Sequence, residues 1–99
     1  MYQVEIDTLV FEEDFKHISK ENQRRILKEI NYKLTSAPER FGKPLRKSLK
    51  GFYKLPIGPY RAVYKIFADK VLVDVIAVGF RRDLEVYKTA LKRLGKCLG

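Results

Sequence analysis

The sequence predicts a small α+β fold in the order β-α-α-β-β-β-α, with an antiparallel sheet packed by an N-terminal helical hairpin and a C-terminal helix. Apolar residues recur with helical spacing before residue 35 and again after residue 83. Between these parts lie three runs with strand-like alternation, separated by short turns. Because 99 residues suffice for one hydrophobic core and little more, we expect a single domain over residues 1–99.

The N-terminal third is predicted to form a strand followed by two helices. Residues 2–6 alternate and predict a short strand. Asp7 and Ser19 each stand where an N-cap residue begins a helix, and residues 35–44, with Ser, Pro and Gly, end the second helix. The expected apolar stripes are Phe11, Phe15 and Ile18 in the first helix, and Ile26, Leu27, Ile30 and Leu34 in the second.

Three strands are predicted next. In the second of them, Arg61 and Lys65 face one side of the sheet, while Tyr60 and Tyr64 face the other. The third is apolar on both alternating sets except at Asp74, which predicts a central strand covered on both faces. The strands span residues 51–57, 60–67 and 71–78, with a first turn that contains Pro56 and Pro59 and a second turn at residues 68–70.

The last predicted element is a helix over residues 83–94, which follows the break at Gly79. Its leucines have two readings, because they either pack on the sheet or offer an apolar face to a partner. The apolar face holds Leu84, Tyr87, Leu91 and Leu94, and Lys88 and Lys92 lie on the opposite face.

Positive charge is concentrated in the last 60 residues. The chain has 21 Lys and Arg against 12 Asp and Glu, for a net charge of +9. Such a field attracts anions such as nucleic acid or anionic lipid, although plain solubility is the alternative. The segment from residue 40 to residue 65 contains no acid and eight bases, namely Arg40, Lys43, Arg46, Lys47, Lys50, Lys54, Arg61 and Lys65.

The composition argues against several common kinds of site. Cys97 and His17 are the only residues of their types, which leaves no internal disulfide and almost no zinc ligands. His17 sits in a helical pattern and Cys97 lacks a nearby histidine, so neither is expected to be catalytic. No glycine-rich phosphate loop, signal peptide or membrane-length apolar run is visible. We therefore expect no cofactor or metal, and a cytoplasmic location.

The remaining chemistry belongs to cations and phenols. Lys54 and Arg61 lie on neighbouring strands of one hairpin, close enough to share a ligand. Arg81 follows the end of the central strand, and Tyr87 lies in the helix after it. We predict that these four side chains converge at one edge of the sheet, with a solvated basic face as the alternative.

Three segments carry a family resemblance: "GFYKLPIGPYRAVYKI", "VLVDVIAVGFRRDLEVY" and the closing "ALKRL". The specific pieces are the step Gly58-Pro59-Tyr60-Arg61-Ala62-Val63-Tyr64 and the ending Val78-Gly79-Phe80-Arg81 with Val86-Tyr87. Together and in order, they resemble the RelE branch of the RelE/ParE toxin superfamily. The resemblance implies the toxin of a type II toxin–antitoxin system. Such toxins are ribosome-dependent, metal-independent endoribonucleases that cleave mRNA in the ribosomal A site and inhibit translation.

The resemblance also implies roles for single residues. Lys54 matches a catalytic lysine, Arg61 and Arg81 match two phosphate-facing arginines, and Tyr87 matches a C-terminal tyrosine. The family has a second lysine two residues after the first, and here Pro56 occupies that place. Replacement of the missing lysine by Lys50, Lys47 or Lys43 is the alternative to reduced activity. The expected RNA- or ribosome-binding residues are Lys43, Arg46, Lys47, Lys50, Lys65 and Arg82.

The implied partners are a RelB-like antitoxin with an acidic segment, the ribosome and its mRNA, and DNA only through the antitoxin complex. No membrane partner is expected. Two other functions stay open. One is a ParE-like inhibitor of DNA gyrase, and the other is a translation blocker that binds RNA or the ribosome without cleaving.

Overall fold

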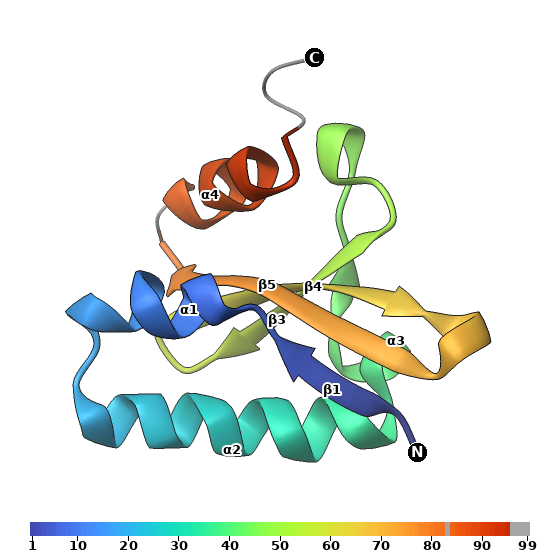
Figure 1. The fold of residues 1–99 in the computed structure, drawn as a ribbon, viewed down its shortest axis with the longest axis horizontal. Helices are drawn as coiled ribbons and strands as arrows, with labels where there is room; N and C mark the ends of the chain where they lie inside the picture. Colours follow the sequence, from blue (N-terminus) through green and yellow to red (C-terminus); the bar gives the residue numbers. More distant parts are fainter. Residues whose placement is uncertain (83, 96–99) are drawn as a thin grey trace.

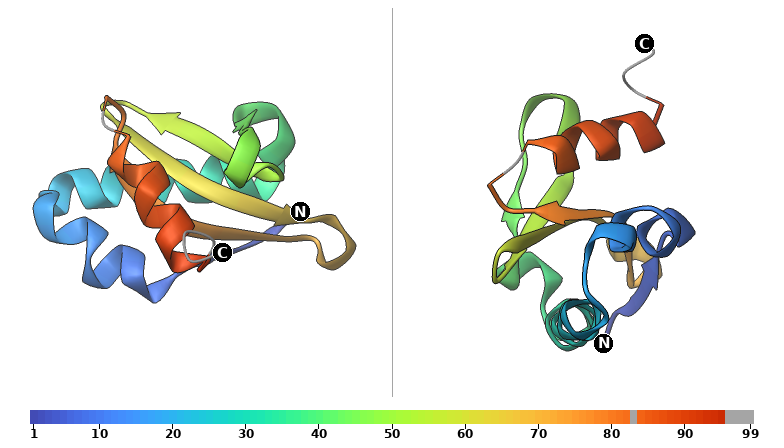
Figure 2. Two further views of the ribbon diagram at one scale, coloured as in Figure 1. Left: turned by 90° about the horizontal axis from the view of Figure 1, so that it is seen from above. Right: turned by 90° about the vertical axis from the view of Figure 1, so that its left-hand side faces the viewer.

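The computed structural model describes residues 1–82 and 84–95 and contains one five-stranded sheet with helices on both faces (Figure 1). The strands are β1 (Gln3–Ile6), β2 (Lys43–Pro44), β3 (Phe52–Ile57), β4 (Tyr60–Phe67) and β5 (Leu72–Phe80). The helices are α1 (Thr8–Glu12), α2 (Lys20–Ser36), α3 (Pro38–Phe41) and α4 (Glu85–Arg93). Helices α1 and α2 lie on one side of the sheet and α4 on the other (Figure 2).

The strand order is β1-β5-β4-β3-β2. Strands β2 to β5 pair antiparallel, as predicted, whereas β1 pairs parallel with β5. Parallel pairing requires a long connection between the two strands, and the connection from β1 to β5 passes through the helices and the other strands. The edge strand β2 was not predicted, because two residues that include a proline carry no periodic signal.

The N-terminal caps are confirmed. The Asp7 carboxylate accepts the Leu9 N–H at 2.8 Å, and the Ser19 hydroxyl accepts the Asn22 N–H at 3.2 Å. Helix α1 is shorter than predicted, because a 3₁₀ turn over Asp14–His17 follows it. As a result, the prediction of one continuous apolar stripe is wrong at Phe11, which is 47% exposed.

The first hydrophobic core lies between α2 and the sheet. Ile26, Ile30 and Leu34 of α2 are buried against Tyr60 and Tyr64 of β4, which confirms the predicted division of the β4 side chains. Other members of this core are Val10, Phe15, Ile18, Leu55, Ile57, Ala62, Val73, Val75 and Val78. Core residues of β5 also lie on the opposite face, so the prediction of a strand covered on both faces is confirmed.

The second core lies under α4. Val86 and Ala90 of this helix are buried against Val63 and Ala77 of the sheet. Leu84, predicted on the apolar face of this helix, does not pack on the sheet: it is 68% exposed, because the helix begins at Glu85 with Leu84 as its N-cap residue. The predicted helix start, Asp83, lies outside the described residues. Partly buried side chains that pack on this core are Leu45, Tyr87, Leu91 and Leu94.

The inner ends of the β3–β4 hairpin are as predicted, because β3 ends at Ile57 and β4 begins at Tyr60, with Gly58 and Pro59 as the turn. Pro56, which was also assigned to the turn, is not part of it: it belongs to β3, where it pairs with Arg61. Gly58 has a φ of 55°, which a residue with a side chain adopts at a cost. Pro56 is therefore a strand residue whose ring lies beside the cations of the sheet.

Among the helices of the described residues, none combines the length and the apolar character that crossing a bilayer requires.

Candidate functional site

The four predicted catalytic residues come from four segments of the chain. Lys54 lies on β3, Arg61 on β4, Arg81 immediately after β5, and Tyr87 in α4. The Arg81 N–H donates to the Pro59 carbonyl at 2.7 Å, which ties the end of β5 to the hairpin turn. Helix α4 lies over one face of the sheet (Figure 2), and its Tyr87 reaches the hairpin through a hydrogen bond with Arg61.

Arg61 and Tyr87 are in direct contact. The Arg61 Nη1 donates a hydrogen bond to the Tyr87 hydroxyl, and the guanidinium carbon lies 5.6 Å from the centre of the Tyr87 ring. The Nε of Arg61 is buried and has no hydrogen-bond partner among the described residues. A buried donor without a partner is unfavourable, which makes this Nε an unusual atom among the described residues.

Lys54 lies diagonally across from Arg61. In the β3–β4 register, Lys54 faces Val63 and Pro56 faces Arg61. Alternation along the two strands places all four side chains on the face that α4 covers. Diagonal neighbours of this kind remain within reach of long side chains, so Lys54 and Arg61 can contact one ligand, as predicted.

The pKa of Lys54 is lowered from its ordinary value. Partial burial is the largest cause, followed by the positive charges of Arg61, Lys43 and Arg81. The shift has the direction expected for an ammonium group that loses water and gains like-charged neighbours. Three cations from different segments therefore act on Lys54, which supports the predicted convergence of Lys54, Arg61 and Arg81.

Three lysines were considered for the place of the missing second lysine, and Lys43 is the one that lies on β2 directly opposite Lys54 in the strand register. Lys47 begins a 3₁₀ turn and Lys50 follows it. All three lysines are exposed, but only the charge of Lys43 is among the causes that lower the Lys54 pKa. The structure thus favours Lys43 over Lys47 and Lys50 as the second cation beside Lys54.

Two hollows extend the site along the segment between β2 and β3. One, of about 520 Å³, has Lys43, Arg46 and Lys54 in its wall. The other, of about 290 Å³, lies against α4 and is lined by Leu45, Arg46, Lys47, Ser48, Leu49, Tyr87 and Leu91. The hollows share Leu45 and Arg46, so a cationic surface continues from Lys54 to Tyr87.

Two other predicted RNA-binding residues, Lys65 and Arg82, lie farther from the four predicted catalytic residues. The Lys65 ammonium lies 5.5 Å and 5.1 Å from the ring centres of Phe52 and Phe67. Lys65 is four residues from Arg61 on β4, about 13 Å along the strand. Arg82 is exposed beyond the end of β5. If these residues bind RNA, they do so outside the cluster around Arg61.

His17, which was not expected to be catalytic, lies away from Lys54, Arg61, Arg81 and Tyr87. His17 is exposed in the 3₁₀ turn on the other side of α4, where it lines a hollow with Glu13 and Glu85. Cys97 lies outside the described residues. No group of three His, Cys, Asp or Glu side chains suited to a metal ion occurs in residues 1–82 and 84–95.

A sequence model of a known family covers most of the chain. The family is described as the ParE toxin of type II toxin–antitoxin systems, parDE, and the match spans residues 8–85. The mRNA interferase toxin RelE of Escherichia coli (strain K12) is 49% identical over 41 residues, which are 41% of this chain and 43% of that protein. The chain thus matches less than half the length of this curated relative.

Solved structures share the fold over more of the chain. The toxin–antitoxin complex RelBE2 from Mycobacterium tuberculosis superimposes with a TM-score of 0.68 at 28% identity, over 81% of this chain and 98% of that chain. The isolated E. coli RelE toxin superimposes with a TM-score of 0.64 at 26% identity, over 95% of this chain and 99% of that chain. These likenesses confirm the predicted α+β fold class.

Proposed function

The chain belongs to the ParE toxin family of type II toxin–antitoxin systems, and on that premise we propose that it is a toxin that cleaves messenger RNA on the ribosome. The family match confirms the resemblance to the RelE/ParE superfamily. The observation that carries the activity is the contact of Arg61 with Tyr87 beside Lys54, whose pKa is lowered by burial and nearby cations. Similarity to a RelE protein named an mRNA interferase supports the same activity.

Arg61 is the group best suited to hold the scissile phosphate. Its guanidinium stays charged and presents several N–H donors in a fixed plane that matches phosphate oxygens. Arg61 is only partly buried as a residue, so an incoming anion can reach its side chain. The N–H donors of this side chain stabilise the crowded phosphorane that forms when the 2′-hydroxyl attacks phosphorus.

Lys54 is proposed as the base that removes the 2′-hydroxyl proton. A base works best when its pKa lies near the working pH, and the ordinary lysine pKa is too high for this role. Burial and the charges of Arg61, Lys43 and Arg81 move the Lys54 pKa in the useful direction. We assign Lys43 the place of the second family lysine, because it pairs with Lys54 in the sheet.

Arg81 and Tyr87 complete the site. Arg81 stabilises the leaving 5′-oxygen by its positive charge, and this oxygen takes its proton from water, because a guanidinium gives up a proton poorly. Tyr87 orients Arg61 through its hydroxyl and offers its ring to a base of the RNA. All of these roles use side chains of the protein, so the proposed reaction needs no metal ion.

The ribosome is proposed to supply the orientation that the protein lacks. A lysine base remains poorly matched to neutral pH, so the free protein should be a weak nuclease. Holding the codon in line for attack lowers the barrier through proximity and orientation. Incubation of the purified protein with naked RNA and with translating ribosomes tests this. We expect cleavage on ribosomes only, and equal or greater cleavage of naked RNA would refute the proposal.

A RelB-like antitoxin is the proposed protein partner. The solved relatives include a RelBE2 toxin–antitoxin complex, and the +9 charge of this chain favours an acidic segment. A disordered acidic tail that folds on the basic surface would neutralise the cluster around Arg61.

Inhibition of DNA gyrase is the second candidate function. The matching family model carries the name ParE, and the superfamily resemblance includes gyrase inhibitors. Under this alternative, the Arg61–Tyr87 contact would have no role in cleaving RNA. DNA damage rather than arrested translation after expression would support it.

A further inference from the structure

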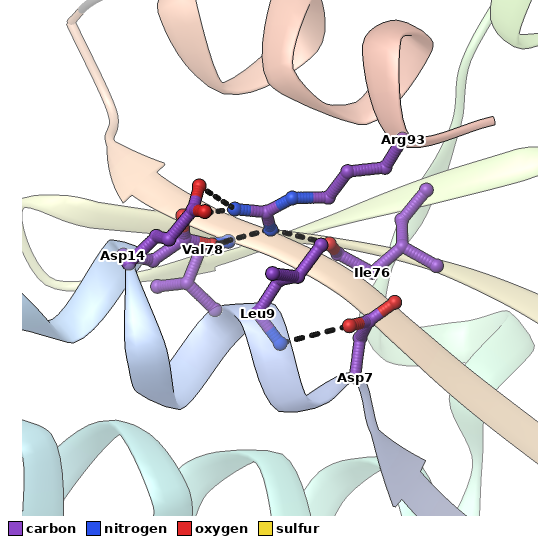
Figure 3. A network of polar contacts seen from close by, with 7 residues as sticks. Asp7, Leu9, Asp14, Ile76, Val78 and Arg93 are labelled. Carbon is purple, nitrogen blue, oxygen red and sulfur yellow. Dashed lines mark hydrogen bonds and ion pairs between the residues drawn. The ribbon is translucent and has the colours of Figure 1, made fainter. Parts of the chain in front are cut away.

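Arg93 makes the shortest and most buried ion pair among the described residues, and nothing in its sequence position indicates a role. It is the last residue of α4, yet its side chain is only 8% exposed. Its guanidinium passes toward the sheet and meets Asp14, whose side chain is 9% exposed (Figure 3). The two residues are separated by 79 positions, so no local sequence pattern connects them.

The pair is bidentate and short. The Arg93 Nη2 lies 2.7 Å from Asp14 Oδ1, and the Nη1 donates to Oδ2 at 2.9 Å. Burial disfavours the charged guanidinium, but the hydrogen bonds and the charge of Asp14 outweigh it, so the pKa of Arg93 lies above its ordinary value. Planar two-point pairing of this kind fixes orientation as well as distance.

Both partners also bind the backbone of β5. The Arg93 Nη1 donates to the Ile76 carbonyl at 2.8 Å, and Asp14 Oδ2 accepts the Val78 N–H at 2.8 Å (Figure 3). Strand β1 pairs with β5 only as far as Val75, so these groups lie beyond the end of β1. The ion pair therefore continues the hydrogen bonding of the sheet edge where the strand partner stops.

Besides Arg93, few side chains hold α4 firmly on the sheet. Only Val86 and Ala90 of α4 are buried hydrophobic residues. Arg93 fastens the far end of the helix, and Tyr87 lies six residues before it, about 9 Å along the axis. When the Arg93 end of α4 slides or tilts, Tyr87 moves with the helix and away from Arg61. The ion pair of Arg93 opposes this movement.

We propose that Arg93, paired with Asp14, is a positioning residue that locks α4 on the sheet and thereby holds the Tyr87 hydroxyl against Arg61. Its effect on cleavage rests on the proposed nuclease function, but its effect on the Arg61–Tyr87 contact does not. Arg93 touches neither substrate nor reacting atoms and acts only through Tyr87.

The first experiment reads the contact without using activity. NMR spectra would follow the Tyr87 ring signal, assigned with Tyr87→Phe, in the full chain. We expect Arg93→Met to move this signal toward its position in Arg61→Met and to speed hydrogen exchange in α4. The matched control is Lys92→Met, which removes an exposed cation from the same helical turn and should leave the signal in place.

A second variant distinguishes a displaced Tyr87 from an unfolded protein. Arg93→Met leaves the Asp14 carboxylate buried without its counter-ion, which destabilises the fold. In Asp14→Asn/Arg93→Met both charges are absent and the amide oxygen can still accept the Val78 N–H, so this protein should fold. It should show the same shifted Tyr87 signal. An unmoved Tyr87 signal in this folded double variant would overturn the proposal.

The third experiment is a double-mutant cycle on ribosomal cleavage. Because small displacements of an oriented group cost up to about 100-fold in rate, Asp14→Asn/Arg93→Met should lower the rate at saturating ribosomes. On a Tyr87→Phe background, the same change should have little further effect, whereas independent, multiplying losses would refute positioning through Tyr87. A wild-type protein that cleaves nothing, with a Tyr87 signal that still shifts, would refute the nuclease and leave the positioning role standing.

Discussion

The Arg61 guanidinium donates a hydrogen bond to the Tyr87 hydroxyl and lies beside the face of the same ring. This contact joins the central hairpin of the sheet to the C-terminal helix. The charge of Arg61 is also one of the causes that lower the pKa of Lys54. The proposed phosphate-binding role of Arg61 rests on this grouping of cations around a guanidinium.

Tyr87→Phe should reduce ribosomal cleavage about tenfold, because one hydrogen bond to a charged group at the site is lost while the ring remains. The fold should persist, since the α4 core residues are untouched. Rates on translating ribosomes measure the effect. The control is Tyr32→Phe, which alters an exposed tyrosine on α2. Equal rates for wild type and Tyr87→Phe would remove the hydroxyl from the mechanism.

Lys43→Gln should shift the pH dependence of cleavage to higher pH. The neutral form of Lys54 is the proposed base, so cleavage rises as pH approaches the lowered Lys54 pKa from below. Removing the Lys43 charge takes away one cause of that lowering, so the pKa rises and less base is present at neutral pH. Lys70→Gln, which lies at the β4–β5 turn, should leave the profile unchanged. If the pH dependence of cleavage is the same in Lys43→Gln as in the wild type, this result would argue against Lys54 as the base.

Pro56→Lys should increase cleavage. Position 56 lies directly opposite Arg61, so a lysine there adds a cation on the face that carries Lys54. The added charge would stabilise the phosphorane and lower the Lys54 pKa further. Pro56→Met controls for loss of the proline ring. A Pro56→Lys protein no faster than Pro56→Met would mean that Lys43 already fills the role.

Gly79→Ala should destabilise the protein by about 1–3 kcal/mol, the usual cost of overpacking. A Cβ at this position would lie 2.9 Å from the Val86 Cβ, so α4 would have to move away from β5. Urea denaturation measures the stability, and the Tyr87 ring signal reports the movement. Unchanged stability together with an unmoved signal would show that α4 is packed more loosely than the structure indicates.

Local patterns in the sequence predicted much of the fold. Alternation in β4 separated Arg61 and Val63 from the buried tyrosines, and the side chains of Asp7 and Ser19 marked two helix starts. The last helix was predicted over residues 83–94 but begins at Glu85, so Leu84 is an exposed N-cap residue. An apolar residue just before a helix looks the same in the sequence as one inside it. The other residues predicted on this face, Tyr87, Leu91 and Leu94, do pack on the core under α4.

Long-range relationships were beyond the sequence. The pairing of Lys43 with Lys54 depends on a two-residue strand, and the Asp14–Arg93 pair joins segments from opposite ends of the chain. Neither has a periodic or motif signal, since each arises only when the segments meet in the fold. The four predicted catalytic residues were grouped from their places on the predicted strands and helix, whereas their roles come from the family resemblance and remain predictions.

The most direct test is a map of mRNA 5′ ends in cells after brief induction of the wild-type protein or of Arg61→Ala. For the wild type, we predict new 5′ ends inside translated reading frames, within codons at the ribosomal A site, and arrest of growth. Arg61→Ala should be folded, produce no new ends and permit growth. Growth arrest without new 5′ ends, or equal cleavage by Arg61→Ala, would contradict the proposal.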